Sequence, residues 1–190
     1  MRVFVAGLIG SIVFFMWGAA AHMFLGLGDR GMHVGTPWQG TLAALKQDAP
    51  EPGIYFLPST TMDKMGDPAA QAALQAEAGG KGYAWIVYHP GGNPGAVDMG
   101  PNLGKQYATD LLSSLICAFV LSLVVGGFGK RVLVATAMGV FAWLVVSVTY
   151  WNWYLFPLDY TLGLLGKFLI GWALAGAAIA WWLGRGETRA

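Results

Sequence analysis

Four long apolar runs alternate with polar segments along the chain, and this pattern predicts the fold. The runs cover residues 3–27, 111–128, 132–151 and 162–183. A helix needs about 20 residues to cross the roughly 30 Å of hydrocarbon in a bilayer, so each run is long enough to span it. The sequence therefore predicts a mainly α, polytopic membrane protein with four transmembrane helices, three of them within residues 108–184. Short links predict that helices two, three and four are neighbours in a bundle that helix one closes.

The first run also has the order of parts found in a signal peptide. Arg2 is followed by an apolar stretch and then by Ala19-Ala20-Ala21, which imitates a cleavage site. Apolar character continues past the alanines through Met23-Phe24-Leu25. This continuation favours a transmembrane helix that the protein retains.

Residues 28–107 form a polar insert between the first two runs, rich in charged residues, glycine and proline. Thr36-Pro37-Trp38 is typical of a helix start with proline at the first position, and Asp67-Pro68 opens an alanine-rich helix. Strands are expected at 54–57 and 83–88. The insert is therefore predicted to be a small α+β domain. Two strands alone are marginally stable in water, so we expect the pair to be stabilised by packing against the helices or against a partner protein.

Basic residues near the helix ends predict the orientation. With four crossings, Arg2, Lys130, Arg131, Arg185 and Arg189 fall on one side of the membrane. The positive-inside rule makes this side cytoplasmic. Both termini and the tail 185–190 are then cytoplasmic, and the insert 28–107 is extracytoplasmic. Short loops and this basic bias fit a bacterial inner membrane with a periplasmic insert.

The link between helices three and four is unusually aromatic. Trp and Tyr rings are apolar but carry a polar N–H or O–H, so they settle at the membrane–water boundary. We therefore expect an interfacial aromatic turn on the extracytoplasmic side, made by Tyr150, Trp151, Trp153, Tyr154 and Tyr160.

A layer of polar side chains is predicted near the same boundary, as a speculative ligand site in the outer leaflet. Its members are His22, Asp110, Asn152, Asp159 and Lys167, with Ser113 and Ser114 at the mouth of helix two. Ionisable residues inside a membrane usually face the bundle interior and pair. We expect Lys167 to pair with Asp110 or Asp159. Alternatively, Lys167 extends to the headgroups, and His22 is a satisfied structural residue rather than a ligand of haem or metal.

Composition excludes several classes of protein. The chain is 56% hydrophobic and 11% charged with a net charge of +1, which argues against a soluble domain and a nucleic-acid surface. One cysteine, Cys117, rules out an intramolecular disulfide and haem attachment through Cys-x-x-Cys-His. Methionines and histidines of the insert are too dispersed to indicate copper. We predict no metal and no cofactor, with bound lipid as the expected small molecule.

The absence of known catalytic motifs directs the functional prediction. The leading hypothesis is a non-catalytic accessory or assembly subunit of a larger inner-membrane complex, with small residues such as Gly171 and Ala175 on helix faces that permit close packing. Its partners would be the lipid bilayer and other membrane subunits, or a second copy. The alternatives are a binder of a lipid, quinone or other hydrophobic ligand in the outer leaflet, and a membrane enzyme acting on the outer face.

Overall fold

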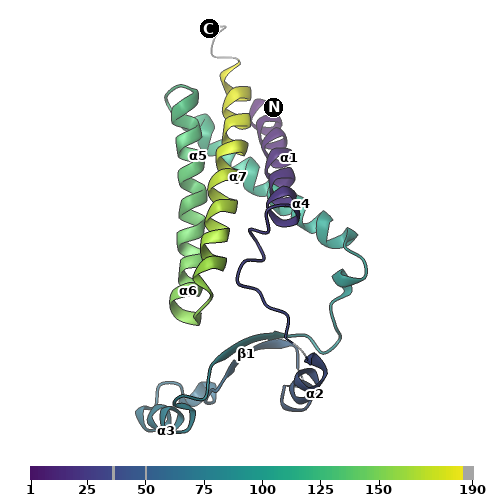
Figure 1. Ribbon diagram of the computed structural model, residues 1–190. Helices are drawn as coiled ribbons and strands as arrows, with labels where there is room; N and C mark the ends of the chain where they lie inside the picture. The colour runs from purple at the N-terminus through teal and green to yellow at the C-terminus, as the bar shows by residue number, and fades with distance from the viewer. Residues whose placement is uncertain (36, 50, 186–190) are drawn as a thin grey trace. The chain divides into compact units, whose positions relative to one another are not determined.

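A computed structural model describes residues 1–35, 37–49 and 51–185 of the chain, which is mainly helical (70%). The chain forms two compact units (Figure 1). We call residues 1–33 with 98–190 the helical unit, and residues 34–97 the insert unit. The predicted insert 28–107 is wider than this, because its two ends belong to the helical unit. Residues 186–190 of the predicted tail, and Thr36 of the predicted helix start, lie outside the described residues.

Four helices of the helical unit are long and apolar enough to cross a membrane, as the apolar runs predict. They are α1 (Arg2–Met23), α4 (Gly100–Leu123), the continuous helix from Phe128 to Tyr154, and α7 (Leu158–Gly184). The third consists of α5 (Phe128–Trp143), one π-helical turn (Leu144–Val148) and α6 (Thr149–Tyr154). Helix α4 begins 11 residues before its apolar run, because the polar segment 100–110 continues the helix.

The helices pack in the order α4, α1, α7, α5, and α4 makes few contacts with α5. The prediction that helices two and three are neighbours is therefore wrong beyond the turn that joins them. Close approach at glycines explains this order. A Cβ at Gly7 of α1 would lie 2.7 Å from Leu115 Cδ2 of α4, and one at Gly139 of α5 would lie 2.7 Å from Trp172 Cδ1 of α7. The core comprises Ala6, Phe14, Cys117, Ala118, Leu121, Ala135, Trp172, Ala175, Ile179 and Leu183.

Basic side chains join helices at one end of the helical unit, which we call the terminal end because α1 begins and α7 ends there. The Arg2 guanidinium donates to the Leu183 carbonyl in the last turn of α7. The buried Arg131 donates from Nε to the Leu121 carbonyl, 3.2 Å away, near the end of α4. The last carbonyls of a helix have no intrahelical partner, so these arginines satisfy them.

The opposite end, which we call the turn end, contains the aromatic link. Leu155 has a left-handed backbone (φ 56°) between α6 and α7. The Tyr150 ring contacts those of Tyr154 and Phe156 at centroid distances of 5.7 and 5.4 Å. The rings thus pack on one another around the predicted turn. Trp153 is 73% exposed, so its indole remains available to an interface.

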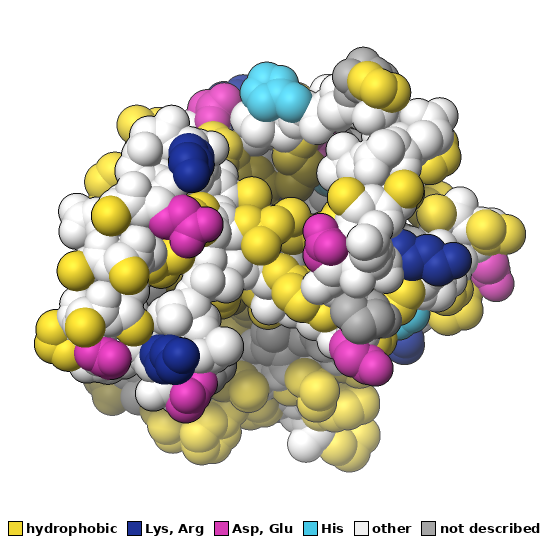
Figure 2. Space-filling model, turned by 90° about the horizontal axis from the view of Figure 1, so that it is seen from below, with side chains coloured by type: hydrophobic (Ala, Val, Ile, Leu, Met, Phe, Trp, Pro, Cys, Tyr) yellow, Lys and Arg dark blue, Asp and Glu magenta, His cyan; other side chains and the backbone are white. Residues whose placement is uncertain are grey.

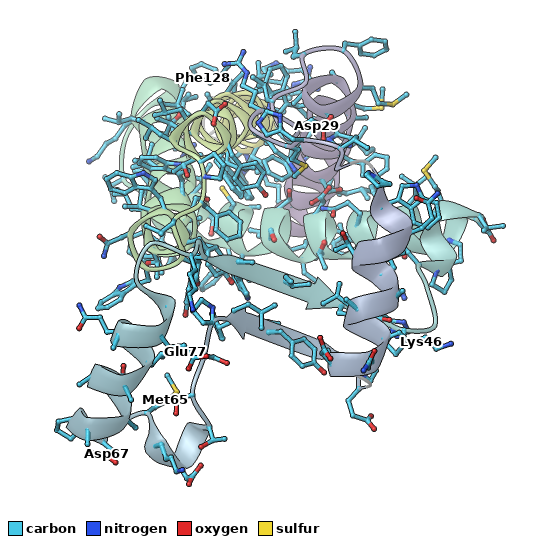
Figure 3. All side chains as sticks on the ribbon, turned by 60° about the horizontal axis from the view of Figure 1, so that its bottom comes forward. Asp29, Lys46, Met65, Asp67, Glu77 and Phe128 are labelled. Carbon is cyan, nitrogen blue, oxygen red and sulfur yellow. The ribbon has the colours of Figure 1, made fainter. Side chains whose placement is uncertain are left out.

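The insert unit is a two-stranded antiparallel sheet with one helix near each end (Figure 3). Its elements are α2 (Trp38–Asp48), β1 (Gly53–Leu57), the 3₁₀ turn Met62–Lys64, α3 (Pro68–Ala78), β2 (Ala84–Tyr88) and the 3₁₀ turn Pro94–Ala96. Gly53 pairs with Tyr88 and Leu57 with Ala84. Asp67 caps α3 by accepting from the Ala69 N–H at 2.9 Å. Both predicted strands are therefore confirmed.

Candidate functional site

Polar side chains gather on the face of α4 that packs against α1. Tyr107, Asp110 and Ser114 follow one another at spacings of three and four residues, which places them on one side of a helix. Asp110 is 6% exposed and Ser114 is fully buried. The Gln106 side-chain amide donates to Asp110 Oδ1 at 2.8 Å. A carboxyl group and a hydroxyl group are therefore buried where α4 packs against its neighbouring helices.

Helix α1 contributes small and hydroxyl-bearing residues to the same interface. Ser11 Oγ lies 3.4 Å from the Tyr107 hydroxyl and donates to the Leu8 carbonyl at 2.8 Å. A Cβ added at Gly10 would lie 3.6 Å from Ser114 Cβ, so Ser114 faces α1 at this glycine. Within the described residues, Ser114 Oγ has no hydrogen-bond partner. Leaving a buried hydroxyl without a hydrogen bond lowers stability by about 1–3 kcal/mol. The Ser114 hydroxyl can therefore still form a favourable hydrogen bond with another group.

Helix α7 brings Lys167 to the group. Helices α4 and α7 contact each other, and Lys167 and Asp110 form no ion pair within 4.0 Å in the described part of the chain. The Lys167 backbone carbonyl accepts a hydrogen bond from Trp17 Nε1 of α1 at 2.9 Å. This bond fixes the backbone that carries the lysine. We call Ser11, Gln106, Tyr107, Asp110, Ser114 and Lys167 the interhelical polar cluster.

The other predicted site residues lie apart from this cluster. His22 Nδ1 is 3.5 Å from Asp29 Oδ1, and both side chains are more than half exposed. Asp159 Oδ1 accepts from the Tyr160 N–H at 3.0 Å, and Gly31 packs beside it. No ion pair joins Asp159 to Lys167 among the described residues. Asn152 is exposed on α6. The predicted layer thus divides into an interior part, with Asp110 and Lys167, and groups at the turn end.

Three members of the cluster, Ser11, Gln106 and Tyr107, were missing from the predicted site. Gln106 and Tyr107 belong to the predicted polar insert, because the apolar run begins only at Leu111. Helix α4 starts at Gly100 and therefore carries both residues: Tyr107 is half-buried beside Ser11 of α1, and the exposed Gln106 donates to Asp110. The signal that could have found them is the spacing of Tyr107, Asp110 and Ser114, which is helical even though the segment is polar.

The chemistry of the cluster suits hydrogen bonding rather than metal binding. It offers hydroxyl, amide, carboxylate and ammonium groups, and no group of three or more His, Cys, Asp or Glu able to hold a metal ion occurs in the described ranges. These groups can form hydrogen bonds with a polar group that belongs to an otherwise apolar molecule or helix. That group could belong to a neighbouring helix or to an amphiphile.

Comparisons with protein-family models, with curated proteins and with solved structures give no match to this chain.

Proposed function

We propose that this protein is a non-catalytic accessory or assembly subunit of a larger membrane complex. The observation that carries the proposal is the relation between Asp110 and Lys167. Asp110 on α4 and Lys167 on α7 are ionisable groups on two candidate membrane spans that contact each other, and no ion pair within 4.0 Å joins them in the part of the chain that the structure describes. Lys167 stands nine residues into α7, about 14 Å along the helix, and is half-buried.

Charges within a membrane are costly, so they normally pair with each other or with backbone carbonyls. Here Asp110 receives one hydrogen bond, from Gln106, and keeps further acceptor capacity. The Lys167 ammonium carries three donors. A polar side chain on a partner's helix would form hydrogen bonds with both the carboxylate and the ammonium. These hydrogen bonds would make the association specific.

Exposed helix surface also supports an assembled state. In the most apolar stretch of α1 and of α4, only 28% of the residues are buried. In the corresponding stretch of the helix from Phe128 to Tyr154, 17% are buried. Small residues already bring α1, α7 and α5 close together. The remaining surfaces would face lipid or partner helices. In this proposal both termini are cytoplasmic and the insert unit is periplasmic, in a bacterial inner membrane.

A second function is favoured by the unpartnered Ser114 hydroxyl. The protein would bind a lipid, a quinone or another amphiphile in the outer leaflet, and the carbonyl or hydroxyl of that ligand would bond to Ser114 and its neighbours. Tyr107 and Gln106 lie about two turns nearer to the start of α4 and would line the entrance. Such a ligand would copurify with the protein in place of a partner chain.

The test is purification from the native membrane in a gentle detergent, followed by native-gel sizing and mass spectrometry of proteins and small molecules. We expect a stoichiometric partner with the wild-type protein and several-fold less of it with Lys167→Met. The matched control is Ser113→Ala, because Ser113 is half-buried and, among the described residues, bonds only to the Thr109 carbonyl of its own helix. A particle with no other protein would overturn the subunit proposal. A retained hydrophobic molecule that Asp110→Asn releases would establish the second function instead.

A further inference from the structure

Charged side chains divide unevenly between the two ends of the helical unit. The described acidic residues of this unit lie in the first half of α4 or α7, or in the segments that lead to the insert unit: Asp29, Asp98, Asp110 and Asp159. These positions are away from the terminal end, where α1 and α5 begin and α4 and α7 end (Figure 1). On the face of the molecule in Figure 2, by contrast, acidic and basic side chains are interspersed.

The terminal end carries basic side chains instead, which are Arg2, Lys130, Arg131 and Arg185. Residues 186–190, outside the described part, add one acidic and one basic side chain. Among the described residues the one ion pair joins His22 to Asp29, so Arg2, Lys130 and Arg185 have no carboxylate within ion-pair distance there. The charges of these three residues are therefore not compensated by a carboxylate of the described chain.

Neutral groups hold these three cations in place. The Arg2 guanidinium donates to a carbonyl in the last turn of α7, and Lys130 Nζ donates to a carbonyl of the link between α4 and α5 at 2.8 Å. The Arg185 guanidinium carbon lies 3.7 Å from the centroid of the Trp181 ring, which is a cation–π contact. A carbonyl or a ring orients a cation without cancelling its charge. All three side chains are exposed and keep further N–H donors for a ligand.

These donors suit a phosphate group at the surface of a bilayer. A guanidinium presents parallel N–H groups that bind two phosphate oxygens at once, and an ammonium acts as a point charge. Trp181 is 49% exposed near the end of a candidate membrane span, and tryptophan settles at the boundary between hydrocarbon and water. The phosphates of phospholipids lie at this boundary. Because Arg185 stacks on Trp181, its guanidinium is at the depth of lipid headgroups when the helical unit spans a bilayer.

We propose that the terminal end binds the headgroups of anionic phospholipids through Arg2, Lys130 and Arg185. A soluble phosphate offers the same chemistry, but lipid phosphates surround the ends of all four candidate spans at a higher effective concentration. An anionic lipid is preferred to a zwitterionic lipid, because it brings a net negative charge to a surface with an excess of positive charge. The proposal requires that the helical unit spans a bilayer. It does not depend on the orientation in the membrane or on the accessory-subunit function.

The experiment uses the full chain in an uncharged detergent. Native mass spectrometry counts the retained lipid molecules while phosphatidylglycerol, or phosphatidylcholine with the same acyl chains, is added. We expect phosphatidylglycerol to bind several-fold more tightly than phosphatidylcholine, with a smaller difference at high salt. Arg185→Gln and Lys130→Gln should each weaken phosphatidylglycerol binding about fivefold and change phosphatidylcholine binding much less. The matched control is Lys105→Gln, because Lys105 is exposed near the start of α4, at the other end of the helical unit, and its loss changes the net charge equally.

Equal binding of the two lipids by the wild-type chain would overturn the proposal. A loss for Lys105→Gln as large as that for Lys130→Gln would also overturn it, because net charge rather than the terminal end would then be responsible. Displacement of bound phosphatidylglycerol by millimolar glycerol phosphate would assign the site to a soluble phosphate instead of a lipid. Arg185→Lys separates charge from damage to the helix end. It should recover most of the affinity lost in Arg185→Gln, and no recovery would contradict the proposal.

Discussion

The two units of this protein contain similar apolar side chains but use them differently. In the helical unit, Ile179 is fully buried within a core shared by α1, α4, α5 and α7. In the insert unit, Ile54 is more than half exposed on a strand. The helical unit is held by close packing at glycines and by polar ties between helices. The insert unit is held by local caps and one strand ladder. Apolar content therefore does not indicate where a unit obtains its stability.

The same substitution in each unit tests this comparison most strongly. Ile179→Ala should lower the free energy of unfolding by about 3 kcal/mol, because the lost contacts leave a cavity. Ile54→Ala should lower it by less than about 1 kcal/mol in detergent, because the side chain is already exposed. Unfolding of the purified chain in mixed micelles measures both. Equal losses would show that the insert unit has a core of its own.

Loss of the hydrogen bonds between helices should give the next largest decrease in stability. Arg131→Met should destabilise the helical unit by about 2 kcal/mol, because it removes charged hydrogen bonds to carbonyls at the end of α4. Lys130→Met is the matched control. It removes the same charge from the same end of the unit, but its side chain is exposed and, within the described ranges, bonds only to the Val125 carbonyl. If both variants unfold alike, net charge rather than the buried tie is responsible.

Local structure in the insert unit should respond to a cap. Asp67→Ala removes the acceptor for the Ala69 N–H and should destabilise α3 by about 1 kcal/mol. Amide hydrogen exchange in α3 should accelerate about fivefold while α1 and α7 remain unchanged. Asp63→Ala serves as the control, since Asp63 lies in the preceding 3₁₀ turn. Faster exchange in both units would contradict their independence.

The smallest expected effect concerns Asp110 and Lys167. A double-mutant cycle with Asp110→Asn and Lys167→Met should give a coupling energy of about 0.5 kcal/mol in the isolated chain, because the groups lie beyond ion-pair distance. The coupling should increase when the proposed partner is bound. A coupling of several kcal/mol in the isolated chain would mean that the pair is complete without a partner.

Much of the local structure could be predicted from the sequence. The four long helices follow from the length of the apolar runs, and the strands 53–57 and 84–88 follow from β-branched and aromatic residues bounded by glycine and proline. The start of α4 could not be predicted this way, because residues 100–110 are polar and helical at once. Gln106 and Tyr107 were lost from the predicted site for that reason.

Helix neighbours and the candidate site depended on the tertiary structure. Hydrophobicity is a property of one segment, so it predicts that a helix can cross a membrane without predicting which helix it contacts. Contact depends on matching shapes from distant segments, such as Gly7 with Leu115 and Gly139 with Trp172. The packing of α4 against α1 and α7 is what buries Asp110 and places Ser114 at Gly10. The sequence by itself therefore determined the elements and their polarity, while tertiary packing decided which polar groups meet.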